Sequence, residues 1–310
     1  IDPGALVTTP YDMLINEMVE TSRGAARHGS VGLGINETVT RSESSEFQLA
    51  AGEALRDRGA AASLLRRIRD AWVPRRVAAL GIGEEYQRRR ELVESDALVE
   101  SWLAVLDDFL QRVEVRWDTD VLGEHEHVVF EGAQGLALDQ VRGTFPHVTR
   151  SHTGVRNVVE LMAELPPADV AVTYATRAYL TRHGAGPLPG ELPDKPFPGV
   201  YDRTNVPHAF QGTIRYALLD VAALQRRISE DFRDTDALGR AGIRMDVAVT
   251  CLDQLPELAR WTRDGEEVAG SPDALVDAIL EGLPAEELFV SHGPRAADVA
   301  AVAVSGTWHH

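Results

Sequence analysis

The chain has 310 residues, a formal net charge of −17, 44% hydrophobic residues and a single cysteine, Cys251. This length suffices for one large α/β domain with additions or for two domains. The negative charge argues against broad, salt-dependent nucleic-acid binding. A lone cysteine cannot form an internal disulfide, which favours a reducing compartment. There is no apolar run of about 18 residues and no signal-peptide pattern, so a cytoplasmic protein without a membrane partner is expected.

Helices are predicted through much of the first third of the chain. Apolar residues recur at helical spacing in 11–23, and longer helices are expected over 46–72 and 84–117. The apolar stripe in the last of these favours core or subunit packing over a ligand site. We expect residues 46–117 to form a helical insertion in a larger domain.

A loop is predicted at residues 27–35, between the first and second of these helices. Its small and flexible residues are typical of a loop that lies close to a ligand. Gly32 and Gly34 form a G-x-G pair, but no strand precedes it. A dinucleotide-binding fingerprint is therefore not indicated.

The segment after residue 127 carries a strand signal followed by two glycines that flank one amide. Val128, Val129 and Phe130 are β-branched or aromatic and predict a short buried strand. Glycine lets the backbone approach a ligand closely. Gln134 can donate and accept hydrogen bonds, so it can read a carbonyl and an amine of one heterocycle. We expect its side chain to project into a pocket; the other interpretation of the pattern is an ordinary strand-to-loop turn.

The second half of the chain alternates strand and helix signals. Strands are predicted at 170–179, 245–249 and 288–290, with a helix near 218–228 and an irregular loop at 181–191. These elements indicate an α/β fold. The histidines of the region lack metal-ligand spacing, so no metal site is predicted from them.

Three segments stand in a fixed order: FEGAQG at 130–135, DQVRGTFPHVT at 139–149 and TRHGAGPLPGE at 181–191. This order closely resembles adenylosuccinate synthetase, a family that joins the 6-position of IMP to aspartate with GTP and magnesium. The resemblance extends from about residue 1 to residue 304. It implies a mainly parallel sheet of the P-loop NTPase kind, a GTP-dependent ligase of purine nucleotide biosynthesis, small-molecule substrates and a homodimer.

The family's Gly-rich phosphate loop has no counterpart in this sequence. Lys195, the only lysine, lies in a proline-bounded loop instead. Because residues 1–3 resemble the interior of a family member, we expect the first strand, the phosphate loop and the Mg²⁺ ligands to precede residue 1. The chain alone is then expected not to consume GTP. Genuine loss of the loop is the alternative, and it would imply a non-catalytic nucleotide-binding homologue.

The resemblance implies contacts with the purine nucleotide. Gln134 is the implied catalytic residue, positioning the 6-oxygen and N1. Thr149 and the loop of Ser30 and Gly32 are implied to hold the 5′-phosphate, although valine replaces the family's threonine next to Ser30. His183 is implied to contact the ribose.

The family's aspartate-binding loop corresponds to the segment after residue 208. An arginine suits this role because its planar fork grips a carboxylate at two points. The family carries several arginines here, whereas this chain keeps one. That divergence leaves open a variant ligase with a different purine or amine donor. The implied contacts are Gln211, Gly212, Thr213 and Arg215.

Two short motifs are implied to bind the guanine of GTP. A carboxylate only accepts hydrogen bonds, so Asp253 matches the adjacent N1–H and exocyclic amine of guanine. Cys251 stands where the family has a lysine that lies along the base. The implied GTP-binding residues are Cys251, Leu252, Asp253, Ser291, His292 and Gly293.

Overall fold

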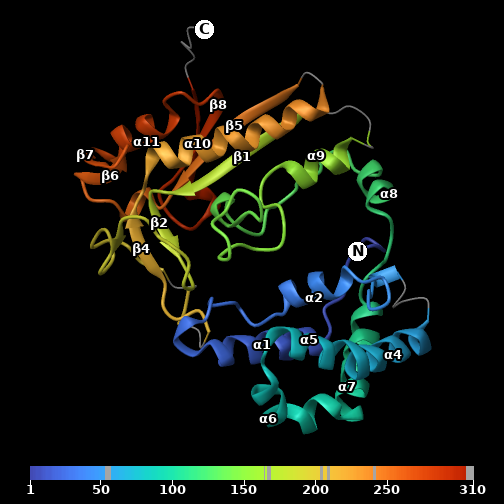
Figure 1. Cartoon of the computed structure of the whole chain (residues 1–310). Coiled ribbons are helices and arrows are strands. Elements are labelled where there is room, and N and C mark those ends of the chain that lie inside the picture. Colours follow the sequence, from blue (N-terminus) through green and yellow to red (C-terminus); the bar gives the residue numbers. More distant parts are fainter. Residues whose placement is uncertain are drawn as a thin grey trace. The chain divides into compact units, whose positions relative to one another are not determined.

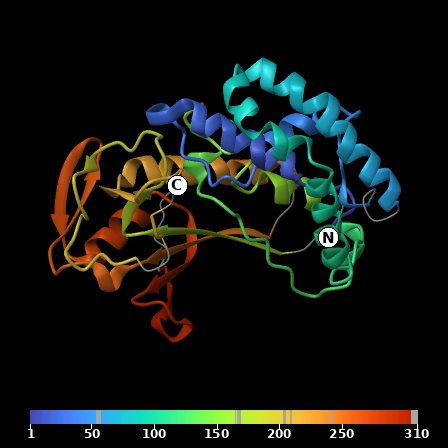
Figure 2. The same cartoon turned by 90° about the horizontal axis from the view of Figure 1, so that it is seen from below.

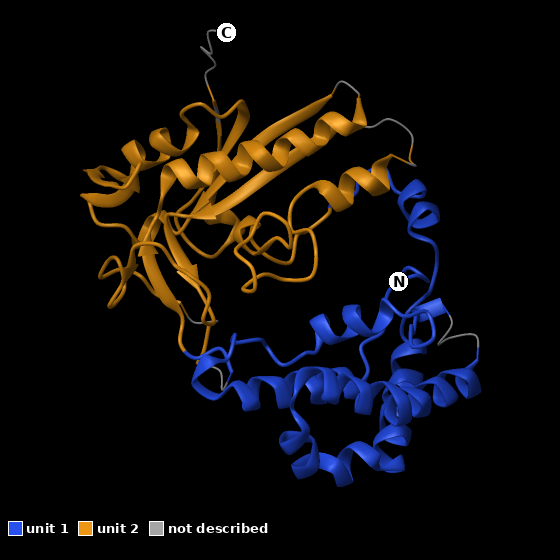
Figure 3. Ribbon diagram, in the orientation of Figure 1, with its two compact units in different colours: residues 1–129, 208–212 blue, residues 130–207, 213–310 orange. Residues whose placement is uncertain are grey.

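The computed structural model describes residues 1–52, 57–163, 165, 169–202, 205–207, 210–239 and 242–304 (Figure 1). The chain forms two compact units (Figure 3). Unit 1 comprises Ile1–Val129 and His208–Gly212, and unit 2 comprises Phe130–Pro207 and Thr213–His310. Unit 1 is helical, whereas unit 2 combines strands and helices.

Unit 1 is built from helices joined by short connections (Figures 1 and 2). Its core consists of buried apolar side chains such as Ile15, Leu65, Val77 and Leu103. A 3-10 turn follows α1, and a π-helical turn, η2 (Ile68–Trp72), joins α4 to α5. The described α-helices are α1 (Pro10–Arg23), α2 (Ile35–Ser42), α4 (Arg58–Arg67), α5 (Val73–Leu80), α6 (Gly83–Glu94), α7 (Asp96–Leu110) and α8 (Asp118–Gly123).

The start of α1 shows why the predicted helix at 11–23 forms. Thr9 and Asp12 form a capping box, and Pro10 occupies the first turn, where its missing N–H is not needed. The buried guanidinium of Arg41 in α2 donates to both oxygens of Asp12 and to the carbonyl oxygen of Val7. Both helices are thereby held together by a fully buried and hydrogen-bonded ion pair.

The two longer helix predictions were correct in type and wrong in extent. Residues 46–49 are not helical, and the helix expected to end at 72 continues into α5; residues 53–56 lie outside the described part. The helix expected over 84–117 divides at Ser95, whose hydroxyl accepts the N–H of Ala97 and so begins α7. Residues 111–117 are not helical. The helical region also extends beyond 46–117, because α1, α2 and α8 belong to the same unit.

Unit 2 contains a mainly parallel sheet, as predicted. Its order is β1-β5-β8-β9, with β1, β5 and β8 parallel and β9 antiparallel to β8. The core includes Tyr174, Val247, Leu275 and Leu288. The strands are β1 (Val170–Arg177), β5 (Ile243–Thr250), β8 (Ala285–Ser291) and β9 (Val299–Ala303), and the helices are α9 (Arg156–Met162), α10 (Val221–Phe232) and α11 (Pro272–Leu280).

The predicted strands at 245–249 and 288–290 are confirmed, and that at 170–179 is confirmed up to Arg177. The helix expected near 218–228 begins later, at Val221. Asp220 accepts the N–H of Ala223 with its side chain and caps α10. The residues before it form β4 instead.

Two smaller sheets complete unit 2. One has the order β2-β4-β3 and is antiparallel, with β2 (Tyr179–Arg182), β3 (Glu191–Leu192) and β4 (Arg215–Leu218). The other pairs β6 (Ala259–Arg263) with β7 (Glu266–Gly270) and lies at the edge of unit 2 in both views (Figures 1 and 2).

The buried strand predicted at Val128–Phe130 was wrong. These residues have no strand assignment, and Val129 is 91% exposed. β-branched residues form strands where a neighbouring strand and a packing surface support them. No described strand pairs with Val128–Phe130, so the local preference has no partner.

Candidate functional site

The carboxyl ends of two neighbouring strands bring together the segments expected to bind guanine. β5 and β8 pair in parallel, with Val249 opposite Val290. Cys251–Asp253 follows β5, and Ser291–Gly293 lies at the end of β8. Parallel neighbours end at the same edge of a sheet, where ligands of α/β proteins bind. This edge is therefore a candidate nucleotide site.

The segment after β5 turns sharply at Cys251. Its φ is 64°, in the left-handed region that a residue with a Cβ rarely adopts. The turn begins η5 (Leu252–Gln254), in which Leu252 is buried and Asp253 is exposed. The buried leucine anchors the turn, and the carboxylate of Asp253 faces solvent at the sheet edge.

The segment after β8 is held by close contacts. Ser291 Oγ donates to the carbonyl oxygen of Gly293 at 2.9 Å. The N–H of His292 donates to the carbonyl oxygen of Asp298 at 3.0 Å. A Cβ on Gly293 would lie 2.5 Å from Asp298 Oδ2, so only glycine lets the loop close in this way. The Ser291–Gly293 segment is thus held in place beside β5, the strand that precedes Asp253.

His183 and Arg215 lie at the loop that joins β2 to β3. His183 Nε2 is 2.8 Å from Asn205 Oδ1. Arg215 Nη1 donates to Glu191 Oε2 at 2.5 Å, and its Nη2 donates to the carbonyl oxygens of Gly184, at 2.6 Å, and Gly186. A ligand carboxylate at Arg215 would have to compete with Glu191.

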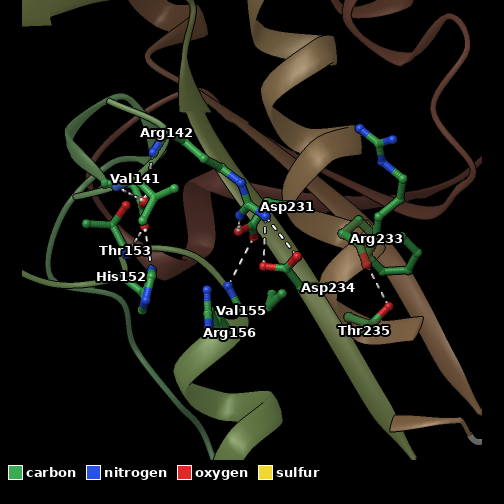
Figure 4. Close-up of polar contacts among 12 residues, drawn as sticks. Val141, Arg142, His152, Thr153, Val155, Arg156, Asp231, Arg233, Asp234 and Thr235 are labelled. Atoms are coloured by element: carbon green, nitrogen blue, oxygen red, sulfur yellow. Dashed lines mark hydrogen bonds and ion pairs between the residues drawn. The ribbon is translucent and has the colours of Figure 1, made fainter. Parts of the chain in front are cut away.

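Asp139 folds the glutamine-containing segment of unit 2 back on itself. Its Oδ1 accepts the N–H groups of Val141, at 2.8 Å, and Arg142, at 3.1 Å, and its Oδ2 accepts that of Thr153 at 2.9 Å. The three donor residues are labelled in Figure 4. Burial acts to raise the pKa of Asp139, but these donors and nearby His152 outweigh it, so the pKa lies below its ordinary value. The carboxylate is therefore built to stay ionised.

Asp231 of α10 ties the same segment to the sheet (Figure 4). Its Oδ1 accepts Arg142 Nη1 at 2.7 Å, and its Oδ2 accepts the N–H of Val155 at 3.0 Å and the hydroxyl of Tyr174 at 2.9 Å. Arg142 Nη2 also bonds both oxygens of Asp234 at 2.8 Å. Burial raises the pKa of Asp231 despite these donors.

Gln134 and Thr149 lie within this tied segment. The N–H of Thr149 donates to the carbonyl oxygen of Leu138 at 2.8 Å, and Thr149 is half-buried. Gln134 is exposed in unit 2. The expectation that it projects into a pocket is therefore wrong for this unit, because no buried strand precedes it.

Ser30 lies in unit 1, in the loop that was predicted after α1. Ser30 Oγ donates to Asn16 Oδ1 at 2.9 Å. Glu20 accepts the N–H groups of His28, Gly29 and Ser30. Burial acts to raise the pKa of Glu20. The three N–H donors and Arg23 outweigh this effect, so the pKa lies below its ordinary value. A carboxylate thus occupies the position where backbone N–H groups could meet a phosphate.

Gly32 borders an apolar pocket of unit 1 with a volume of about 370 Å³, lined among others by Leu14, Val31, Leu92 and Phe210. In the same unit, Gln211 and Gly212 are half-buried. Thr213 is exposed and belongs to unit 2.

The supporting residues were not predicted as site residues. Asp139 stands inside a recognised segment, so the motif itself pointed to it. Asp231 lies outside the recognised segments. Its side chain accepts a hydrogen bond from the N–H of Val155, which is 76 positions away in the sequence. No local pattern could have indicated it.

No group of three or more His, Cys, Asp or Glu side chains in the described part of the chain could hold a metal ion. Among the same residues, no helix is both long and apolar enough to cross a membrane.

Comparison with known proteins places this architecture in context. Residues 1–227 match the family model described as adenylosuccinate synthetase. Adenylosuccinate synthetase 1 of Cupriavidus pinatubonensis is 29% identical over 93% of this chain and 64% of its own length. The enzyme of Lacticaseibacillus casei is 33% identical over 50% of this chain and 35% of its own length. The chain thus spans less than two thirds of these relatives.

Solved structures share the fold at 16% sequence identity. The fully ligated adenylosuccinate synthetase of Plasmodium falciparum gives a TM-score of 0.61, covering 96% of this chain and 76% of that one. The succinoaminodeoxyadenylate synthetase (PurZ) of cyanophage S-2L, bound to dGMP and dATP as an energy donor, gives a TM-score of 0.51. This match covers 96% of this chain and 67% of that one.

Proposed function

Because the chain belongs to the adenylosuccinate synthetase family, we propose that it is part of a GTP-dependent ligase that joins the 6-position of an IMP-like purine nucleotide to aspartate. The observation that carries this proposal is the edge of β5 and β8, where exposed Asp253 lies beside the Ser291–Gly293 segment. An acceptor-only carboxylate at this edge suits guanine. Cys251, Leu252 and His292 complete the proposed GTP-binding segments.

The proposed reaction has two stages. The γ-phosphoryl group of GTP is transferred to the purine 6-oxygen, and the amine of aspartate then attacks C6 as inorganic phosphate leaves with that oxygen. The first stage places negative charge on the 6-oxygen, which a positioned hydrogen-bond donor stabilises. Gln134 is proposed to do this, with Thr149 at the 5′-phosphate and His183 at the ribose.

Arg215 is proposed to meet the carboxylate of the amine donor, in competition with Glu191. Thr213, Gln211 and Gly212 are proposed as further substrate-binding residues. Ser30 and Gly32 are proposed to contact the 5′-phosphate; because Glu20 occupies the nearby N–H groups, this contact would require that loop to rearrange.

Further parts of the proposal follow from the family alone. They are a homodimer, a cytoplasmic location and a requirement for Mg²⁺. No described residue is assigned to the metal.

A variant ligase is the second candidate. It is favoured by the engagement of Arg215 with Glu191 and two glycine carbonyl oxygens, which is an unusual state for a residue meant to grip aspartate. A non-catalytic nucleotide-binding homologue is the third.

The test is a matrix of reactions with the full-length protein. The acceptors are IMP and dGMP, the donors are GTP and dATP, and the amine is L-aspartate, with C–N bond formation followed by mass spectrometry. We expect product from IMP and GTP. Product only from another pair would identify a variant ligase. Absence of product from every pair, with GTP binding retained in calorimetry, would support the non-catalytic homologue.

A further inference from the structure

Arg182 and Arg215 stand directly opposite each other on two antiparallel strands. β2 and β4 pair with Arg182 in register with Arg215. Directly opposed residues of an antiparallel pair point to the same face of the sheet, with their Cβ atoms about 5 Å apart. Both residues are half-buried. Two guanidinium groups therefore share one partly desolvated face.

The two guanidinium groups differ in how they are compensated. Arg215 forms an ion pair with Glu191 and donates to two carbonyl oxygens. Arg182 donates only from Nη2, to the carbonyl oxygen of His147 at 3.0 Å. Within the described residues it has no carboxylate partner, and its buried Nε has no acceptor. Like charges that lie directly opposite each other destabilise a sheet. A bound anion beside the Arg182 guanidinium would offset this repulsion.

The neighbouring loop is shaped around Arg182. A Cβ on Gly186 would lie 1.9 Å from Arg182 Nη2 and 2.3 Å from its Cζ. With the guanidinium in this position, glycine leaves room for the loop backbone to lie against it. Burial, together with the charge of Arg215, lowers the pKa of Arg182. The fold therefore places a positive charge where burial and a neighbouring like charge both disfavour it, an arrangement that also occurs at functional sites.

We propose that Arg182 binds an anionic group of a substrate, either a carboxylate or a phosphate, and that Arg215 and Glu191 brace the loop that shapes its site. An incoming anion supplies the acceptor that Nε and Nη1 lack and offsets the repulsion between the two guanidinium groups. The proposal rests on the proposed function only in taking the anion to belong to a substrate. It differs from the role proposed for Arg215, whose Nη1 and Nη2 are already engaged, although its Nε also has no acceptor.

Calorimetry on the full-length protein tests this proposal without requiring turnover. The probes are L-aspartate, IMP, inosine and inorganic phosphate, each alone, and L-aspartate in the presence of IMP. The variants are Arg182→Met and Arg182→Lys. Arg260→Gln is the control, because Arg260 is an exposed arginine of β6 that forms an ion pair with Glu267. Melting temperature is measured in parallel.

We expect Arg182→Met to bind one anion about tenfold or more weakly, because a charge-assisted hydrogen bond is lost. Loss confined to L-aspartate identifies a carboxylate, and loss for IMP but not inosine identifies a phosphate. Arg182→Lys should recover part of the affinity, and the control should bind as the wild type does. Without ligand, Arg182→Met should melt at the same or a higher temperature, because the repulsion is removed.

Three outcomes overturn the proposal: wild-type affinity of Arg182→Met for every probe, no binding of any anion by the wild type, or failure of both Arg182 variants to fold. The last would show that the guanidinium is structural. Anion binding through Arg182 without product in the reaction matrix would instead contradict the proposed function and leave this site intact.

Discussion

Gly154 and Asp231 lie so close together that no side chain fits between them. A Cβ at Gly154 would be 1.7 Å from Asp231 Oδ1. This approach brings the N–H of Val155 to Asp231 Oδ2, where the hydroxyl of Tyr174 also donates. One glycine thus allows a buried carboxylate of α10 to hold the segment that carries Gln134 and Thr149.

Replacement of Gly154 by alanine should therefore loosen this segment. The added methyl group must displace Asp231 and break buried hydrogen bonds, so Gly154→Ala should lower the free energy of unfolding by about 2–3 kcal/mol. Urea denaturation measures the change. Gly135→Ala is the control, since a Cβ there meets nothing within 4 Å and should change stability by less than about 0.5 kcal/mol. Equal effects at both glycines would contradict the packing argument.

The stabilisation from Asp139 should depend on pH. Its folded-state pKa lies below the ordinary value of 3.8, because N–H donors outweigh burial. A depressed carboxyl pKa stabilises the fold above the unfolded-state pKa, and this contribution is lost as pH falls through the folded-state value. Asp139→Asn should thus lower the free energy of unfolding by about 1–3 kcal/mol at neutral pH. The difference from wild type should shrink below about pH 3.8, the ordinary value. A difference independent of pH would show that the charge is irrelevant.

Gln134→Leu tests the proposed catalytic residue in the full-length protein. Leucine keeps the volume but removes both hydrogen-bonding groups. Because the 6-oxygen gains charge in the transition state, kcat should fall by about 10²-fold or more. The melting temperature should be unchanged, since Gln134 is exposed in unit 2. Gln140→Leu, a nearby exposed glutamine, serves as the control. A normal kcat with a lower melting temperature would assign Gln134 a structural role.

Asp253→Asn tests the proposed guanine contact. One acceptor oxygen becomes a donor that faces the N–H groups of the base. The loss should be about 2–3 kcal/mol, which corresponds to a KM for GTP raised about 30- to 150-fold. Steady-state kinetics with GTP and dATP measure the change, and Asp277→Asn, on the exposed side of α11, is the control. An unchanged preference for GTP would refute the assignment.

Local patterns were sufficient for the elements whose partners lie nearby in sequence. The capping box of Thr9 and Asp12 spans three positions and starts α1, and the apolar residues of β5 identify a buried strand without reference to its neighbours. The ordered motifs between residues 130 and 191 likewise indicated the family that the comparison then showed. The start of α1 and the strand β5 depend on short-range contacts and alternation, which the sequence records directly.

Tertiary contacts decided the rest. Val128–Phe130 has strand-forming residues but no strand beside it, so it stays exposed. Tertiary contacts also determine which charges lie near each other. Arg182 and Arg215 are 33 positions apart, and only the pairing of β2 with β4 places them opposite each other. Glu191 then engages one of them and leaves the other without a carboxylate among the described residues. A single sequence records which charges exist, whereas the fold determines which of them are neutralised, because Coulomb interactions depend on distance and burial rather than on order along the chain.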